Sequence, residues 1–240
     1  MQRHHFEYRE TIVTLICDPA FFDAGERSLR RSRDCVEAYI ASDPEYRDTH
    51  APYAPRENAD RLVLRMADEA ARAGVGPMAS VAGALADACL ADLLAAGADE
   101  AVVDNGGDIA LFIRRPIRVG LYAGASPMTG LAFDVAPRPG VFGICTSSGT
   151  VGHSFSYGRA DAAVVIAANA ALADAAATAL GNRVRSAGDL ESCFDFLQGL
   201  ESVEGGLAIL GDRMGMWGVL PPLVRSEIDP ERVTRGRNGP

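Results

Sequence analysis

The feature that most constrains the fold is a run of short strand-like segments between residues 101 and 145 that no helical segment interrupts. The first two segments flank Asn105, Gly106 and Gly107, a combination typical of a tight hairpin turn. Further strand-like segments cover residues 118–122, 131–135 and 141–145. Because helices and strands do not alternate regularly along the chain, we expect an α+β fold, layered, with a mixed or antiparallel sheet and covering helices.

Helical segments and outer strands lie on both sides of this run. Apolar periodicity or an alanine-rich composition predicts helices over residues 26–43, 56–74, 76–97, 170–182 and 189–202. Strands are predicted over residues 10–18 and 161–169, a hairpin over residues 205–223, and a loop over the polar, proline-containing residues 43–55. The helix that starts near Gly76 also carries Gly83, and such small residues allow another backbone or a ligand to come close.

Length and composition give the expected domain organisation. Residues 1–224 are enough for one domain with a substantial core. Residues 225–240 are charged and rich in glycine and proline, so they are expected to form a flexible tail. A domain of this size is compatible with a homodimer, although no segment indicates an interface.

Bulk composition excludes several partners and favours a cytoplasmic location. The net charge of −9 argues against binding to a nucleic acid polymer. No apolar run approaches the roughly 18–20 residues that would span a membrane, and the N-terminus lacks the apolar core of a signal peptide. The five cysteines are scattered without a C-x-x-C pair, which favours reduced thiols in the cytoplasm.

Two residues of the predicted helix 170–182 are candidate metal ligands. Asp174 and Thr178 are four residues apart, so they lie on one helix face. Their carboxylate and hydroxyl oxygens can both bind a hard cation such as Mg²⁺. The spacing has an alternative explanation without a metal: an acid near a helix N-terminus complements the helix dipole, and a threonine hydroxyl bonds the carbonyl four residues earlier. Spacing alone leaves both open.

The segment GICTSSGTVGHSFSYG, residues 143–158, combines reactive side chains with glycines and hydroxyls. Cys145 and His153 are candidate catalytic residues, because a nearby histidine can lower the pKa of a thiol and give a thiolate nucleophile or a sulfur carrier. The hydroxyls and amides between them can hold an anion such as phosphate. The residues of this candidate anion loop are Thr146, Ser147, Ser148 and Gly149. A plain turn between strands explains the same segment.

The hairpin turn is a second candidate for ligand binding. It carries Asn105, Gly106, Gly107 and Asp108. A glycine pair allows backbone amides to face a phosphate or the edge of a ring. A hairpin turn that binds nothing explains these residues equally well.

Four segments, in the same order, resemble the uncharacterised cytoplasmic family related to ApbE. They are AGVGPMASVAGALAD, VVDNGGDIAL, GICTSSGTVGHSFSYGRADA and LADAAATALGN, and the similarity extends from about Tyr8 to Trp217. ApbE proteins are FAD-dependent, Mg²⁺-requiring FMN transferases. The resemblance therefore implies an ApbE-like fold, a flavin ligand (FAD or FMN) and Mg²⁺.

The resemblance also implies roles for the candidate residues. The transferases carry an N-x-GGD turn, a TSG loop and an ADALATA helix, and that helix supplies aspartate and threonine ligands to Mg²⁺. These motifs resemble residues 105–108, residues 146–149 and the segment around Asp174 and Thr178. A third ligand in the transferases is a backbone carbonyl, whose counterpart here lies in residues 76–79.

Two transferase motifs have no counterpart in this sequence. The transferases have A-K-G where this chain has MASVAG without lysine, and H-x-x-D-P-x-T-G where this chain continues from His153 into SFSYGRADA. The sequence thus implies an ApbE-like protein that binds a phosphorylated or nucleotide-like small molecule, such as a flavin, with Mg²⁺, and it does not predict protein flavinylation. A Mg²⁺-dependent transferase-like enzyme is compatible with this interpretation. The alternatives are a cytosolic thiol enzyme or sulfur-transfer protein that uses Cys145, and a non-catalytic accessory protein.

Overall fold

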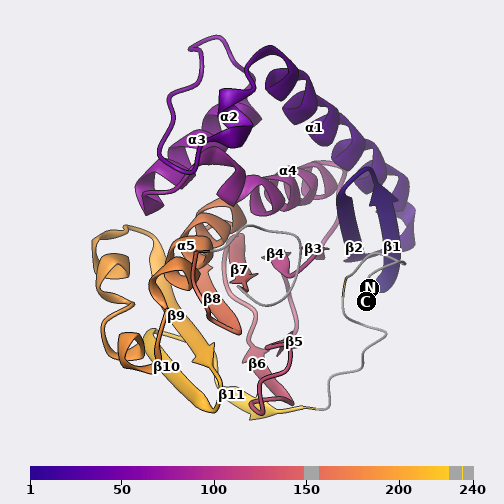
Figure 1. Ribbon diagram of the computed structural model, residues 1–240. Helices are drawn as coiled ribbons and strands as arrows, with labels where there is room; N and C mark the ends of the chain where they lie inside the picture. Colours follow the sequence, from indigo (N-terminus) through magenta and orange to yellow (C-terminus); the bar gives the residue numbers. More distant parts are fainter. Residues whose placement is uncertain (149–156, 227–233, 235–240) are drawn as a thin grey trace.

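The protein is built of three layers, in which a large sheet separates a group of helices from a small sheet (Figure 1). The computed structural model describes residues 1–148, 157–226 and 234. Helices and antiparallel strands are both abundant and lie in separate layers, which confirms the expected α+β fold.

The large sheet has eight antiparallel strands in the order β1-β2-β3-β4-β7-β8-β9-β10. Their bounds are β1 Gln2–Tyr8, β2 Thr11–Cys17, β3 Ala101–Asn105, β4 Asp108–Phe112, β7 Phe142–Ser147, β8 Ala162–Ala167, β9 Val203–Leu210 and β10 Arg213–Gly218. The chain leaves this sheet after β4 to form β5 and β6. These two strands and β11, which follows β10, make the small sheet in the order β11-β6-β5. Its strands are β5 Ile117–Leu121, β6 Leu131–Val135 and β11 Leu223–Arg225. The predicted hairpin between β3 and β4 is confirmed.

The helical layer covers one face of the large sheet. The helices are α1 Phe22–Ser42, α2 Glu45–Asp48, α3 Arg61–Ala73, α4 Val81–Ala95 and α5 Ala170–Arg183. Helix α3 is capped by Gly74, which adopts the left-handed conformation at φ 74° that glycine tolerates best. A 3₁₀ turn, Pro77–Ser80, leads directly into α4.

Both faces of the large sheet are buried, and each has its own core. Leu15, Val103 and Val165 point toward the helices. Val164 and Ile144 point the other way and pack with Phe133 of the small sheet. Successive residues of a strand face opposite sides, which explains why every residue of β8 is apolar and buried.

The structure differs from the predicted elements in several places along the chain. Strand β1 was not predicted, because most of its residues are polar and exposed. Residues 189–202 were predicted to be one helix, but they form parts of two 3₁₀ turns, Ala187–Glu191 and Asp195–Gly199. The predicted helix 56–74 begins only at Arg61, and the predicted loop 43–55 contains α2. At the expected tail, Arg225 belongs to β11 and Thr234 is buried.

Helix α4 is unusually apolar. Together with the preceding 3₁₀ turn it forms the one helical segment of the described residues, Pro77–Ala95, that is long and apolar enough to cross a membrane by length and composition; half of it is buried. The expectation that no apolar run of the sequence approaches the length of a membrane span is therefore wrong for this segment. Helix α4 packs against α1, α5 and β3, and a helix buried on several sides is expected to be apolar around much of its circumference.

Candidate functional site

The start of α5 is packed closely between α4 and β7. Gly83 of α4 faces Ala170 so closely that a Cβ atom at position 83 would overlap the Ala170 carbonyl oxygen and lie 2.6 Å from its carbon. Gly143 of β7 is equally restricted, because its Cβ would lie 2.6 Å from the Ala170 nitrogen. The small residues predicted to allow a close approach therefore admit a second helix backbone.

A carboxylate from each of the helices α4 and α5 accepts hydrogen bonds from backbone N–H groups at the start of the other helix. Asp174 of α5 accepts a hydrogen bond from the backbone nitrogen of Gly83 in the first turn of α4, at 2.9 Å. Asp87 of α4 accepts hydrogen bonds from the backbone nitrogens of Ala170 and Ala171 at the start of α5, both at 3.0 Å. Each helix thus supplies an anionic cap to unpaired N–H groups of the other.

The two capping acids differ in their charge partners. Asp87 also accepts a hydrogen bond from the Arg65 guanidinium at 2.9 Å. Burial raises the pKa of Asp87, and Arg65 opposes this rise. Burial raises the pKa of Asp174 to about 7, against the effect of the α4 amide groups. Asp174 is therefore a buried acid that titrates near neutrality.

Asp108 brings a further carboxyl group to the same place. It is the first residue of β4 and pairs with Cys145 in register. Its Oδ1 atom is buried and has no hydrogen-bond partner among the described residues. The pKa of Asp108 is raised well above its ordinary value by burial and then by the nearby Asp174 charge. A buried carboxyl oxygen without a partner is uncommon and points to a missing ligand, ion or water.

Cys145 lies inside this group of acids and is completely buried. Its Sγ donates to the Ala170 carbonyl oxygen at 3.3 Å. Burial, followed by the charges of Asp108 and Asp174, raises the pKa of the thiol well above its ordinary value. These conditions favour the neutral thiol and disfavour a thiolate. His153, the predicted partner of Cys145, lies outside the described residues.

The predicted ligand-binding turn is anchored on both faces of the sheet. Gly106 and Gly107 adopt positive φ angles of 68° and 102°. On the helix side, the Asn105 Nδ2 donates to the Ala82 carbonyl oxygen at 3.0 Å. On the other side, the Gly107 nitrogen donates to Asp104 Oδ1 at 3.0 Å. The turn therefore holds the first residues of α4 next to the Asp108 and Asp174 carboxyls.

The structure brings only part of the predicted anion loop to this site. Alternation along β7 places Ser147 on the helix side, where its Oγ lies near Gly181 of α5. Thr146 pairs with Val164 in register and points toward the small-sheet side. Ser148 directly follows β7, and Gly149 lies outside the described residues.

A row of polar side chains runs along α5 at intervals of four residues. Asp174 is followed by Thr178, which is partly buried and whose hydroxyl has no hydrogen-bond partner within the part of the chain that the structure describes. The hydrogen bond to the carbonyl four residues earlier, which the metal-free alternative requires, is not formed there. Asn182 comes next, and its Oδ1 accepts from the Tyr157 nitrogen at 2.9 Å. The Tyr157 ring packs edge-on against His50, with ring centroids 5.6 Å apart.

The oxygen atoms of Asp174 and Thr178 in this row, together with the nearby Asp108 of β4, fit a hard cation better than a soft one. Residues 1–148, 157–226 and 234 contain no group of three or more His, Cys, Asp or Glu side chains that could hold a metal ion. The available oxygens are the Asp174 carboxylate, the Thr178 hydroxyl and the unpartnered Oδ1 of Asp108. Hard oxygen donors of this kind suit Mg²⁺.

Asp87 and Asp104 contribute to this site and were not predicted from the sequence. Asp87 had a visible signal, because it is a single acid within an otherwise apolar stretch of the alanine-rich helix. A buried acid of this kind needs hydrogen bonds or a charge partner. No local signal identified the α5 amides as its partners, since residues 87 and 170 are far apart in sequence.

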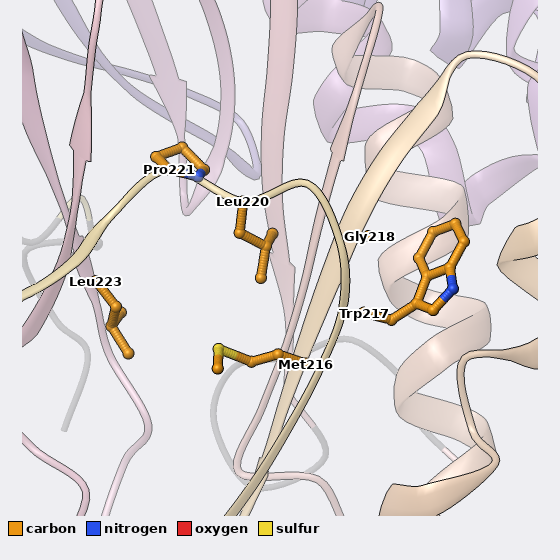
Figure 2. A pocket seen from close by; sticks show the side chains of 6 residues that line it. All are labelled: Met216, Trp217, Gly218, Leu220, Pro221 and Leu223. Carbon is orange, nitrogen blue, oxygen red and sulfur yellow. The ribbon is translucent and has the colours of Figure 1, made fainter.

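A shallow groove of about 340 Å³ lies elsewhere, along β10 and the segment that leads to β11. Figure 2 shows Met216, Leu220 and Leu223 beside this groove, with the Trp217 ring on the other side of the strand. The groove lining carries no carboxyl, hydroxyl, thiol or imidazole group. Strands β8 and β9 separate β10 from β7, so the groove is distinct from the candidate site.

The raised pKa of Asp174 predicts a pH-dependent stability. An acid with a higher pKa in the folded than in the unfolded protein stabilises the fold at low pH, and this contribution is lost as the pH rises, here from 3.8 to about 7. The free energy of unfolding should fall across this window, relative to the Asp174→Asn variant, by up to about 1.4 kcal/mol per pH unit. Urea denaturation across the window measures the difference, and parallel pH profiles for the two proteins would contradict the assignment.

Comparisons with known proteins agree with the fold. The family model described as "AbpE bacteria" matches residues 1–191. The UPF0280 protein of Methanocella arvoryzae is 46% identical over 231 residues, which cover 96% of this chain and 94% of the relative. The UPF0280 protein of Methanosphaerula palustris is 44% identical over 98% of this chain and 99% of the relative.

Solved structures show the same fold at low sequence identity. The flavin transferase ApbE from Vibrio cholerae has a TM-score of 0.55 and 13% identity, over 90% of this chain and 97% of that protein. A mutant of that transferase gives a TM-score of 0.59. The layered fold is therefore that of the ApbE class. The chain belongs to the UPF0280 family and also matches the AbpE bacteria family model.

Proposed function

We propose that this protein binds a phosphorylated, nucleotide-like small molecule, a flavin such as FAD or FMN, together with Mg²⁺ at Asp174 and Thr178. The observation that carries the proposal is the group of buried oxygens at the α4–α5 contact. Asp108 Oδ1 is without a partner among the described residues, and burial raises the pKa of Asp174 to about 7. A divalent cation would compensate for both, since it favours the ionised form of each carboxyl group.

The chain's own residues would have separate tasks in this complex. Asp174 and Thr178 would hold the cation, which supplies positive charge that neutralises a phosphate group. The turn would contact the ligand through the Gly106 amide, because the Gly107 amide donates to Asp104. Asn105 keeps the turn attached to the start of α4 at 3.0 Å. Asp87 and Arg65 would fix the direction of α5, and with it the position of Asp174 and Thr178 in the site.

The proposal covers binding and does not extend to protein flavinylation. The sequence has no counterpart of the transferase A-K-G or H-x-x-D-P-x-T-G motifs. A thiol mechanism at Cys145 gains no support from the structure, because the thiol is completely buried among carboxyl groups that raise its pKa. The cytoplasmic location that we propose is consistent with the five cysteines, all of which are free thiols.

The test is a calorimetric titration with FAD, with and without Mg²⁺, for the wild type and the Thr178→Val variant. Valine replaces a hydroxyl that makes no hydrogen bond to the described residues, so the variant is expected to fold normally. Loss of one ligand should weaken Mg²⁺-dependent FAD binding about 10-fold or more. Thr129→Val changes an exposed threonine of the loop before β6 and should leave binding unchanged.

Three outcomes separate the parts of the proposal. Mg²⁺-dependent binding that is weakened only in Thr178→Val supports both ligand and metal site. Equal binding by the wild type and Thr178→Val in Mg²⁺ would contradict the metal assignment. Failure of the wild type to bind FAD under either condition would overturn the flavin ligand.

A further inference from the structure

Thr234, beyond the end of the small sheet, makes side-chain contacts with the large sheet. Its side chain is buried, with 8% relative exposure. Its hydroxyl oxygen lies 2.5 Å from Asp104 Oδ2 and 2.9 Å from the Thr14 hydroxyl. Thr14 and Asp104 are directly opposite each other on β2 and β3. A residue from the expected tail therefore contacts the neighbouring strands β2 and β3 of the large sheet.

The three groups form a chain of hydrogen bonds. A hydroxyl carries one proton and can donate only once. The shorter contact assigns the Thr234 proton to the Asp104 carboxylate, and the Thr14 proton then goes to the Thr234 oxygen. Hydrogen bonds in such a chain strengthen one another when they are shielded from water.

The second oxygen of Asp104 extends this chain to the candidate site. Asp104 Oδ1 accepts from the backbone nitrogen of Gly107 at 3.0 Å. The neighbouring Asn105 holds the opposite face of the turn to α4. The turn is thus fixed from two sides, by Asn105 and by Asp104. The other oxygen of the Asp104 carboxylate, Oδ2, accepts a hydrogen bond from Thr234.

We propose that Thr234 is a positioning residue of the candidate site, which acts through Asp104 to fix the turn formed by Gly106 and Gly107. Without the Thr234 hydroxyl, Asp104 Oδ2 loses its side-chain donor while the carboxylate remains partly buried, so the carboxylate can turn and release Gly107. The effect of Thr234 on ligand affinity rests on the proposed function. The effect of Thr234 on the turn is independent of the proposed function.

Two measurements on full-length Thr234→Val and Thr234→Ser variants test this inference. Hydrogen exchange, followed by NMR without ligand, reports on the Gly107 amide, with the Val165 amide of the buried strand β8 as an internal reference. In Thr234→Val, the Gly107 amide should exchange about 10-fold faster, as expected when a hydrogen bond worth about 1.4 kcal/mol is lost, while Val165 is unchanged. Thr234→Ser retains the hydroxyl and should restore the wild-type rate.

The second measurement is a titration with FAD and Mg²⁺. Thr234→Val should bind several-fold more weakly than the wild type, and Thr234→Ser should bind normally. Unchanged exchange at Gly107, or equal acceleration at Gly107 and Val165, would overturn the positioning role. Absence of FAD binding in the wild type would reject the proposed ligand, while the exchange rates would still decide the role of Thr234.

Discussion

Replacement of Gly83 by alanine is expected to destabilise the protein by about 2 kcal/mol or more, although the same change in most helices is stabilising by about 1 kcal/mol. A Cβ atom at this position would overlap the Ala170 carbonyl oxygen and crowd the Asp174 Cβ at 2.9 Å. Backbone atoms cannot rotate away, so α4 and α5 must separate. The midpoint of urea denaturation measures the loss.

Gly199→Ala is the matched control for this prediction. Gly199 ends a 3₁₀ turn, and a Cβ atom there would meet no atom within 4 Å. Its alanine variant should stay within about 0.5 kcal/mol of the wild type. Equal stability of the two alanine variants would contradict the close contact between α4 and α5 at Gly83.

Asp87→Ala should be at least as damaging, with a loss of about 2–6 kcal/mol in the free energy of unfolding. The change leaves the amides of Ala170 and Ala171 without their carboxylate acceptor and removes the charge partner of Arg65. Each buried donor that loses its partner costs about 1–3 kcal/mol. Because α5 carries Asp174 and Thr178, the variant should also lose Mg²⁺-dependent FAD binding at temperatures where it remains folded.

Asp60→Ala provides the comparison for an ordinary helix cap. Asp60 accepts from the Leu62 nitrogen at 2.8 Å at the exposed start of α3. Loss of such a cap costs about 1 kcal/mol. Chemical denaturation of both variants measures the contrast, and equal losses for Asp87→Ala and Asp60→Ala would show that the buried cap has no special importance.

Elements with strong local signals could be predicted from the sequence. The Asn105-Gly106-Gly107 turn specifies its hairpin because two successive residues need positive φ. Apolar periodicity and alanine-rich composition predicted α3, α4 and α5, and most of their ends were predicted to within a few residues. Strand β1 gave little signal, because pairing with β2 stabilises it more than the burial of its own side chains.

The candidate site could be predicted only in part, since its geometry depends on contacts between distant segments. The pair Asp174 and Thr178 follows from helical spacing, and Asp108 follows from its place after the turn. The opposite orientations of Thr146 and Ser147 required the register of β7 with β8. The contact between Thr234 and Asp104 links residues 130 positions apart, so no local pattern could indicate it.

The reciprocal capping of α4 by Asp174 and of α5 by Asp87 has an electrostatic consequence for any anionic ligand. Helix N-termini commonly attract phosphate, but here Asp174 and Asp87 already occupy both. With Asp108 nearby, the group holds three carboxyl groups, and one of them is paired with Arg65. An incoming phosphate would be repelled by whichever of these carboxyl groups is ionised, and a bound cation would remove that repulsion. For the binding that we propose, the expected order is therefore metal first, or metal and phosphate together.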